Sequence, residues 1–373
     1  MTYDAILLTG FGGPEGQDDV IPYLRNVTRG RGIPDERLEE VAHHYRHFGG
    51  VSPINDQNRA LKAALEAELA SRGLDLPVYW GNRNWDPYLA DAVRAAHADG
   101  HRRLLAVVTS AYSSYSSCRQ YREDLAGALE ATGLAGEVQI DKVRQYFDHP
   151  GFVTPFVEGV RAALGRAVEA LGPDADPARD VHVLFATHSI PLVTAETSGP
   201  PDAGFGPEGA YAAQHRAVAE VVMAAATTGA DVGTGAGPDV GWSLVYQSRS
   251  GAPSTPWLEP DVNDAIRDLA AGGTRAVVIV PLGFVSDHME VMWDLDEEAM
   301  ETAHDAGLWA ERVPTPGVHA EFVRGLVDLV QERLGDPDAP RPALTALGPW
   351  YDVCRPGCCA NPRGLKPAVA GSD

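Results

Sequence analysis

The chain has 373 residues, a length that suits two domains better than one, and 44% of them are hydrophobic, enough for substantial cores. Asp and Glu outnumber Lys and Arg by 52 to 30, so the formal charge is −22, which argues against a nucleic-acid partner and against unassisted binding to an anionic membrane. The N-terminal residues lack the features of a signal peptide, and no apolar run is long enough to span a membrane, so we expect a soluble, cytoplasmic protein.

Strand and helix signals alternate through the first half of the chain. The first apolar run, 5–9, enters a glycine-rich turn at 10–14. This turn lacks both the third glycine of a dinucleotide-binding motif and the lysine of a phosphate-binding loop, so its glycines more plausibly let the backbone approach a flat ligand. The predicted strands are 5–9, 77–81, 104–109 and 138–143, and the predicted helices are 18–27, 37–48, 55–72 and 87–99.

The second half repeats the same order of elements. Its predicted strands are 181–186, 242–247 and 276–281, and its predicted helices are 152–170, 211–226, 260–271, 283–300 and 319–334. Such alternation implies parallel sheets with right-handed crossovers. We therefore predict an α/β fold with two Rossmann-like, doubly wound domains that face each other across a cleft. The predicted boundaries are 1–150, 151–335 and a C-terminal tail at 336–373.

Two histidines follow predicted strands at their carboxyl ends, where open α/β sheets bind ligands. His188 closes the strand at 181–186, and Pro191 then forces a turn that presents it. His288 and Glu290 occupy the analogous place after another strand. A neutral imidazole can accept a proton near pH 7 or bind a metal, and a nearby carboxylate can hold the imidazolium or relay the proton.

Three carboxylates continue from this point at a spacing of four residues: Glu290, Asp294 and Glu298. In an α-helix each such step rotates by about 40°, so the three fall near one face. A line of carboxylates leading to a strand end could carry a divalent cation or protons. An ordinary solvated acidic face is the plainer alternative.

Other polar segments have both a functional and a plain interpretation. Arg29 and Arg31 form a basic loop in an acidic chain, suited to clamp carboxylates, although they can be ordinary surface arginines. The hydroxyl-rich segment 110–121 is either a polar wall for a ligand or simply a serine-rich helix start. His43 and His47 have the spacing of a metal-binding pair but lack a nearby third ligand, so we predict no metal site there.

The chain has four cysteines: Cys118, Cys354, Cys358 and Cys359. Three of them lie within six residues near the C-terminus. A cytosolic chain of this length neither needs nor keeps disulfides, so this spacing favours a metal site. The chain has neither the GxSxG motif of serine hydrolases nor a nicotinamide-binding fingerprint, which argues against both of those enzyme classes.

Five segments together resemble ferrochelatases, and the match spans about residues 5–334. These segments are LLTGFGGPEG (7–16), VTRGRGIP (27–34), FGGVSPIN (48–55), THSIP (187–191) and FVSDHMEVMWDLDEEA (284–299). The resemblance implies two Rossmann-like domains and the insertion of Fe2+ into a porphyrin, a lyase reaction of heme biosynthesis. It also implies that His188 and Glu290 form the metal-insertion pair, with Asp294 and Glu298 as an acidic line behind them.

The same resemblance implies contacts with the porphyrin. Arg29, Arg31, Ser52 and Tyr121 match positions where the family meets propionates or the ring edge. Phe11 stands where some bacterial relatives carry a tyrosine that faces the metal. Phenylalanine cannot ligate, so we expect Phe11 only to stack on the ring or wedge against it.

The cysteines resemble those of the [2Fe–2S]-bearing branch of the family, which includes many actinobacterial members. Such a cluster needs four thiolates, two per iron, and the chain has four cysteines. Four free thiols, or one zinc ion held by all four thiolates, are the alternatives. We expect the cluster, bound by Cys118, Cys354, Cys358 and Cys359.

The expected substrate is coproporphyrin III, which would give coproheme. Actinobacterial-type relatives resemble the coproporphyrin branch, and the polar groups along 28–31 and 110–121 suit its four propionates. Protoporphyrin IX, with two propionates, is the alternative substrate. A cobalt or nickel chelatase and a non-catalytic tetrapyrrole-binding protein are the rival functions. We expect a transient partner for product hand-over, but neither nucleic-acid binding nor stable membrane insertion.

Overall fold

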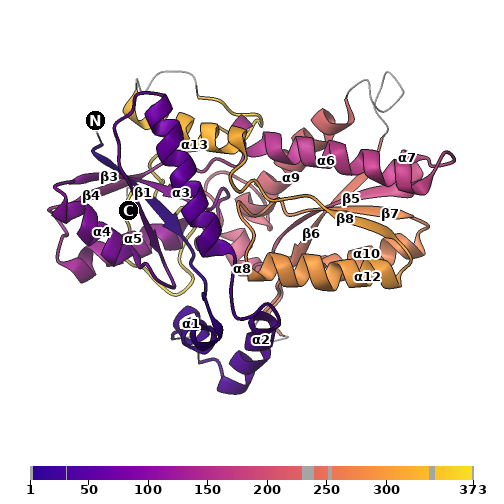
Figure 1. Ribbon diagram of the computed structural model, residues 1–373, viewed down its shortest axis with the longest axis horizontal. Helices are drawn as coiled ribbons and strands as arrows, with labels where there is room; N and C mark the ends of the chain where they lie inside the picture. Colours follow the sequence, from indigo (N-terminus) through magenta and orange to yellow (C-terminus); the bar gives the residue numbers. More distant parts are fainter. Residues whose placement is uncertain (1–2, 31, 229–238, 251–253, 336–340, 372–373) are drawn as a thin grey trace.

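The computed structural model describes residues 3–30, 32–228, 239–250, 254–335 and 341–371, and it contains two four-stranded parallel sheets (Figure 1). The first sheet has the order β2-β1-β3-β4, and the second has the equivalent order β6-β5-β7-β8. All neighbouring strands pair in parallel, so the doubly wound α/β fold is confirmed. The strands are β1 (Ala5–Gly10), β2 (Val78–Asn82), β3 (Arg103–Val108), β4 (Gln139–Lys142), β5 (Val181–His188), β6 (Gly241–Gln247), β7 (Ala276–Val280) and β8 (Trp309–Arg312).

Helices connect the strands and cover both faces of each sheet. The helices of the first half are η1 (Gln17–Asp19), α1 (Val20–Val27), α2 (Asp35–His47), α3 (Ile54–Ser71), α4 (Leu89–Ala98), η2 (Tyr115–Arg119) and α5 (Gln120–Thr132). Those of the second half are α6 (Pro150–Leu171), α7 (Pro177–Asp180), α8 (Leu192–Glu196), α9 (Gly209–Thr227), α10 (Val262–Ala271), α11 (Met289–Val291), η4 (Met292–Ala299), α12 (Met300–Asp305) and α13 (Ala320–Leu334).

The largest hydrophobic core joins the two halves. It contains side chains from one face of each sheet together with α3, α6, α9 and α13, whereas smaller cores lie beneath α4 and α5 and beneath α10 and α12. The last helix, α13, packs against both α6 and α3 (Figure 1). Two arginines of the first half bind it: Arg72 Nη1 lies 2.5 Å from Asp328 Oδ1, and Arg144 forms two hydrogen bonds with Glu332, of 2.8 and 3.1 Å. The domain boundaries near residues 150 and 335 stay a prediction.

The second half differs from the sequence-based expectation in its short helices α7 and α8, in β8 and in the segment that carries Glu290. The edge strand β8 was not predicted, because its four residues are all half-buried and do not form an apolar run. The segment expected to be helical from Gly283 to Met300 starts only at Met289, and its central part, η4, is a π-helix. Such i→i+5 turns are rare and occur frequently at functional sites. None of the helices within the described residues is both long and apolar enough to cross a bilayer.

Candidate active site

His188 and Glu290 meet at one edge of the second sheet. His188 is the last residue of β5, and Glu290 lies in α11, shortly after the neighbouring strand β7. His188 Nε2 lies 3.7 Å from Glu290 Oε2. Their side chains are 33% and 49% exposed, so a substrate can reach both.

The backbone determines which nitrogen of His188 is free. Its Nδ1 contacts the carbonyl oxygen of Ser189, which can only accept a hydrogen bond, so Nδ1 carries the proton. Nε2 is therefore the basic nitrogen, and it faces Glu290. The hydroxyl of Tyr211 donates to the carbonyl oxygen of His188 at 2.9 Å and bonds Thr187 Oγ1 at 2.7 Å, which fixes the strand end beneath the imidazole.

His288 positions Glu290. Its Nδ1 accepts a hydrogen bond of 3.2 Å from the backbone N–H of Glu290, which caps the short helix α11. Burial lowers the pKa of His288, against the opposing effect of the Glu290 charge. His288 is therefore a neutral acceptor near pH 7, and His188 is the histidine that presents a free nitrogen to Glu290.

Asp294 lies one step behind Glu290 and is half-buried. Gln247 Nε2 donates to Asp294 Oδ2 at 3.2 Å and to the carbonyl oxygen of Glu290 at 3.0 Å, and Ser248 Oγ donates to the same Asp294 oxygen. Burial raises the pKa of Asp294 to about 7; the nearby Glu290 and Glu298 charges add to this rise, and the hydrogen bonds from Ser248 and Gln247 oppose it. Asp294 can therefore gain or lose a proton at neutral pH.

Glu298 lies at the outer end of the acidic line. It is exposed and accepts a hydrogen bond of 2.8 Å from Trp293 Nε1. The ring of Trp293 stacks on His44 at 4.0 Å, with the rings of His43 and His47 6.1 and 5.6 Å away. These histidines of α2 therefore pack against η4. Nowhere in the described ranges are three or more His, Cys, Asp or Glu side chains placed to hold a single metal ion.

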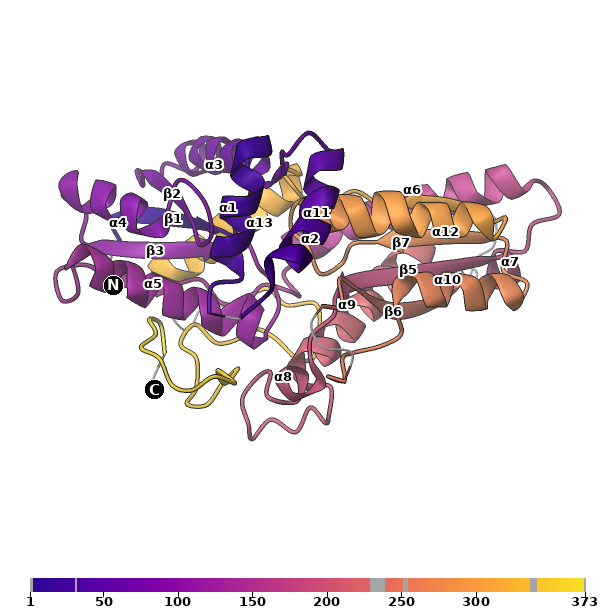
Figure 2. The same ribbon diagram turned by 90° about the horizontal axis from the view of Figure 1, so that it is seen from below.

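Helices α1 and α2 form a small lobe (Figure 1), and α2 lies beside α11 in Figure 2. The ring contacts of Trp293 with the histidines of α2 join this lobe to η4. The apolar cluster of this lobe includes Tyr23 and Tyr45 together with Met289, the neighbour of Glu290, and Phe11 packs against it. Burial raises the pKa of Tyr23, and the Glu290 charge contributes to this rise. The lobe thus brings Phe11 from the first half towards the carboxylate of the second.

The rings of Phe11 and Tyr121 both lie close to the guanidinium group of Arg83. The guanidinium carbon of Arg83 lies 5.5 Å from the centre of the Phe11 ring and 4.5 Å from that of Tyr121. Arg83 is almost fully buried and pairs with Asp124. Arg83 was not predicted from the sequence, because its only signal is its position immediately after β2.

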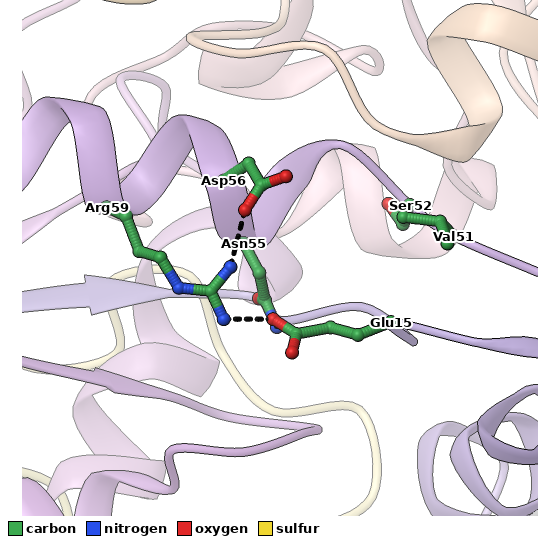
Figure 3. Close-up of a pocket in the computed structure, with 6 residues that line it drawn as sticks. All are labelled: Glu15, Val51, Ser52, Asn55, Asp56 and Arg59. Carbon is green, nitrogen blue, oxygen red and sulfur yellow. Dashed lines mark hydrogen bonds and ion pairs between the residues drawn. The ribbon is translucent and has the colours of Figure 1, made fainter.

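Ser52 is buried beside a polar cavity of about 230 Å³ (Figure 3). Within this cavity Arg59 pairs with both Glu15 and Asp56. Arg29 is exposed just after α1, and Arg31 lies outside the described residues. The remaining residues that line the cavity are Val51 and Asn55.

The four cysteines form one buried cluster, although Cys118 lies in η2 and the others lie in the tail. None of the four forms a disulfide, and Cys358 Sγ lies 3.9 Å from Cys359 Sγ. Hydrogen bonds from the thiols of Cys118 and Cys358 hold the pKa of Cys354 well below its ordinary value. The backbone N–H of Gly199 donates to Cys359 Sγ at 3.2 Å, so the cluster contacts both halves of the chain.

Comparison with known proteins gives concordant matches. A family model described as Ferrochelatase matches residues 3–334. Several relatives carry the name coproporphyrin III ferrochelatase, among them proteins from three bacteria. The protein from Leifsonia xyli is 69% identical, with 100% of this chain and 95% of the relative covered. That from Tropheryma whipplei is 58% identical, with 99% and 92% covered. That from Streptomyces griseus is 54% identical, with 100% and 96% covered.

Proposed function

The chain belongs to the ferrochelatase family, and on that premise we propose that it inserts Fe2+ into coproporphyrin III to give coproheme. The observation that carries the proposal is the contact between His188 Nε2 and Glu290 Oε2 at the exposed edge of the second sheet. Relatives that are 54–69% identical over the whole chain and carry the name coproporphyrin III ferrochelatase support the choice of porphyrin.

Metallation must remove two protons from the pyrrole nitrogens of the ring. In the proposal, His188 Nε2 accepts a proton from the ring, and Glu290 stabilises the imidazolium and passes the proton on. Asp294 receives it, because a carboxyl group with a pKa of about 7 exchanges protons readily at neutral pH. Glu298, at the exposed end of the line, completes the route to solvent. The same carboxylates can accompany the incoming iron in the opposite direction.

The first half supplies the second wall of the proposed porphyrin site. Phe11 contributes an apolar ring that cannot ligate iron, and the cation of Arg83 lies next to both Phe11 and Tyr121. Ser52, Arg29 and Arg31 remain predicted contacts of propionates or the ring edge. Closure of the lobe that carries α1 and α2 over a bound ring would exclude water from the reacting nitrogens.

Coproporphyrin III should be the better substrate by at least about 10-fold in kcat/KM. It has two more carboxylates than protoporphyrin IX, and one hydrogen bond to a charged group contributes about 1.5–3 kcal/mol. Steady-state rates with Fe2+ and each porphyrin measure this preference. Equal or higher kcat/KM with protoporphyrin IX would overturn the choice of substrate, and binding of both porphyrins without loss of their pyrrole protons would indicate a non-catalytic protein. Higher rates with Co2+ or Ni2+ would indicate a different chelatase.

The proposal includes a [2Fe–2S] cluster bound by Cys118, Cys354, Cys358 and Cys359. Four buried thiols that form no disulfide and lie in one cluster fit the ligand set of this [2Fe–2S] group. Each iron takes only two of the thiolates, so the four sulfur atoms need not converge on one point. When bound, the cluster would add a redox-active centre and tie the tail to η2. The cytoplasmic location and a transient partner that receives the product are further predictions.

Replacing Cys118 with serine should remove the visible absorption bands of the cluster and lower the rate of iron insertion. Cys118 stands three residues before Tyr121, so loss of the cluster can disturb the wall of the ring site. Absorption spectra, iron and sulfide content, and turnover of Cys118→Ser measure the effect. Ser116→Ala, an exposed change in the same η2 segment, is the matched control. Unchanged folding and rate in Cys118→Ser would defeat the link between the cluster and the ring site.

A further inference from the structure

One arginine, Arg312, joins the chain segments on either side of Glu290. It is the last residue of β8, and its side chain is 16% exposed. Its Nη1 and Nη2 donate to Asp287 Oδ1 and Oδ2 at 3.2 and 3.3 Å. Its Nε donates to Asp296 Oδ1, and Nη2 also donates to Asp296 Oδ2 at 3.0 Å. One guanidinium group therefore holds two carboxylates, an arrangement that suits its planar set of N–H donors.

The two carboxylates lie before and after the first two groups of the acidic line. Asp287 directly precedes His288, which caps α11 through the backbone N–H of Glu290. Asp296 lies in η4, two residues after Asp294. The segment between the two contacts of Arg312 therefore carries both Glu290 and Asp294, and its position depends on both contacts.

Further hydrogen bonds fix the Asp287 end of this segment. Thr315 Oγ1 donates to Asp287 Oδ1 at 2.9 Å, and the backbone N–H of Asp287 donates to Gln57 Oε1 of α3 at 2.9 Å. The Asp296 end lies in a π-helix, a conformation that is rare in proteins. Arg312 thus connects η4 to a point that is held by β8 and by the first half of the chain.

We propose that Arg312 is a positioning residue for iron insertion, which acts through Asp287 and Asp296 to keep Glu290 and Asp294 in line with His188. This inference rests on the proposed function and goes beyond it, because it assigns a role to a residue of β8, a strand that was not predicted from the sequence. Displacing a reacting group by about 1 Å can lower a rate by about 10²-fold. Loss of the guanidinium group should therefore affect the chemical step more than porphyrin binding.

The substitution Arg312→Ala tests the inference. It should lower kcat about 10–10²-fold and change the KM for coproporphyrin III by less than about threefold, because the walls that bind the ring are unchanged. Millimolar guanidinium chloride should restore part of the lost rate, since the cation can enter the space that the partly exposed side chain leaves, whereas the same concentration of sodium chloride should not. Steady-state kinetics and the Tm of the variant give these readouts.

Arg166→Ala is the matched control. Glu311 precedes Arg312 on β8 and points to the opposite face of the sheet, where it pairs with Arg166 of α6; Arg166 Nε donates to Glu311 Oε2 at 2.7 Å. The control removes an ion pair of the same strand and should keep the wild-type kcat. A wild-type kcat in folded Arg312→Ala, or equal losses in both variants, would overturn the inference. A loss of rate and of porphyrin binding together, without rescue by guanidinium, would also overturn it.

Two milder variants decide the case in which Arg312→Ala does not fold. Arg312→Lys keeps the charge but lacks the planar set of donors, and Asp296→Ala removes one of the two carboxylates. Each should lower kcat by about 3–10-fold, and the double variant should lose no more than Arg312→Lys alone, because both substitutions remove the same contact. Additive losses would refute the role of Arg312. Wild-type protein that inserts no iron would instead refute the proposed function, so the two failures are distinguishable.

Discussion

Replacing His188 with alanine should lower the kcat of iron insertion by about 10²–10⁴-fold, the range typical of losing a general acid–base group. Nε2 of His188 is the basic nitrogen at this edge of the sheet, and it faces Glu290 at 3.7 Å. His288 should not replace it, because His288 already uses Nδ1 to cap α11 and burial lowers its pKa. The porphyrin should still bind, since the other walls of the site are unchanged. Stopped-flow metallation and porphyrin fluorescence measure the two effects separately.

His182→Gln is the matched control for this experiment. His182 lies at the opposite end of the same strand, where its Nε2 is 2.9 Å from Ser243 Oγ. The substitution should keep kcat within a factor of about two of the wild-type value. It shows whether β5 tolerates the loss of an imidazole side chain. A His188→Ala protein that folds, binds porphyrin and turns over at the wild-type rate would eliminate His188 as the base. A loss of rate and of porphyrin binding together would indicate a structural role.

The architecture could be predicted because apolar runs and their order determine it. Strands such as β5 and β7 are buried on both faces and therefore read as continuous hydrophobic segments. Their parallel alternation with helices then requires that the ends of neighbouring strands meet, which is why His188 and Glu290 could be expected to lie together. Their catalytic role stays a prediction.

Other features of the site have no local signal. The edge strand β8 is short and half-buried, and the π-helix η4 has the same composition as an ordinary amphipathic helix. Arg83 and Gln247 contact their partners only through the tertiary fold: Arg83 lies over two rings, and Gln247 donates to Asp294. Sequence spacing placed Asp294 on the acidic line, but only the packing around it reveals that burial raises its pKa to about 7.

Replacing Asp294 with asparagine should lower kcat about 10²-fold near pH 7, the low end of the acid–base range, because in the proposed relay Asp294 receives protons through Glu290, the carboxylate that faces His188. Asparagine retains the shape of the side chain but cannot take up a proton. In the wild type, the profile of kcat against pH should have a limb near pH 7, because Asp294 ionises there with a pKa of about 7. This limb should be absent from the profile of the Asp294→Asn variant. A variant that keeps this limb would remove Asp294 from the relay.

The same substitution should stabilise the protein at high pH. The pKa of Asp294 rises from an ordinary value of 3.8 to about 7 on folding, so the folded state binds more protons between these values and wild-type stability falls as pH rises through that window. The amide of the Asp294→Asn variant does not ionise, so the advantage of this variant in unfolding free energy should be absent near pH 4 and reach about 2–4 kcal/mol above pH 7. Urea unfolding at pH 5, 6, 7 and 8 measures it. Glu301→Gln, which removes an exposed carboxylate from α12, is the control and should show no such trend. Identical pH dependence in Asp294→Asn and wild type would mean that Asp294 is ionised throughout, and the proposed relay would lose its central group.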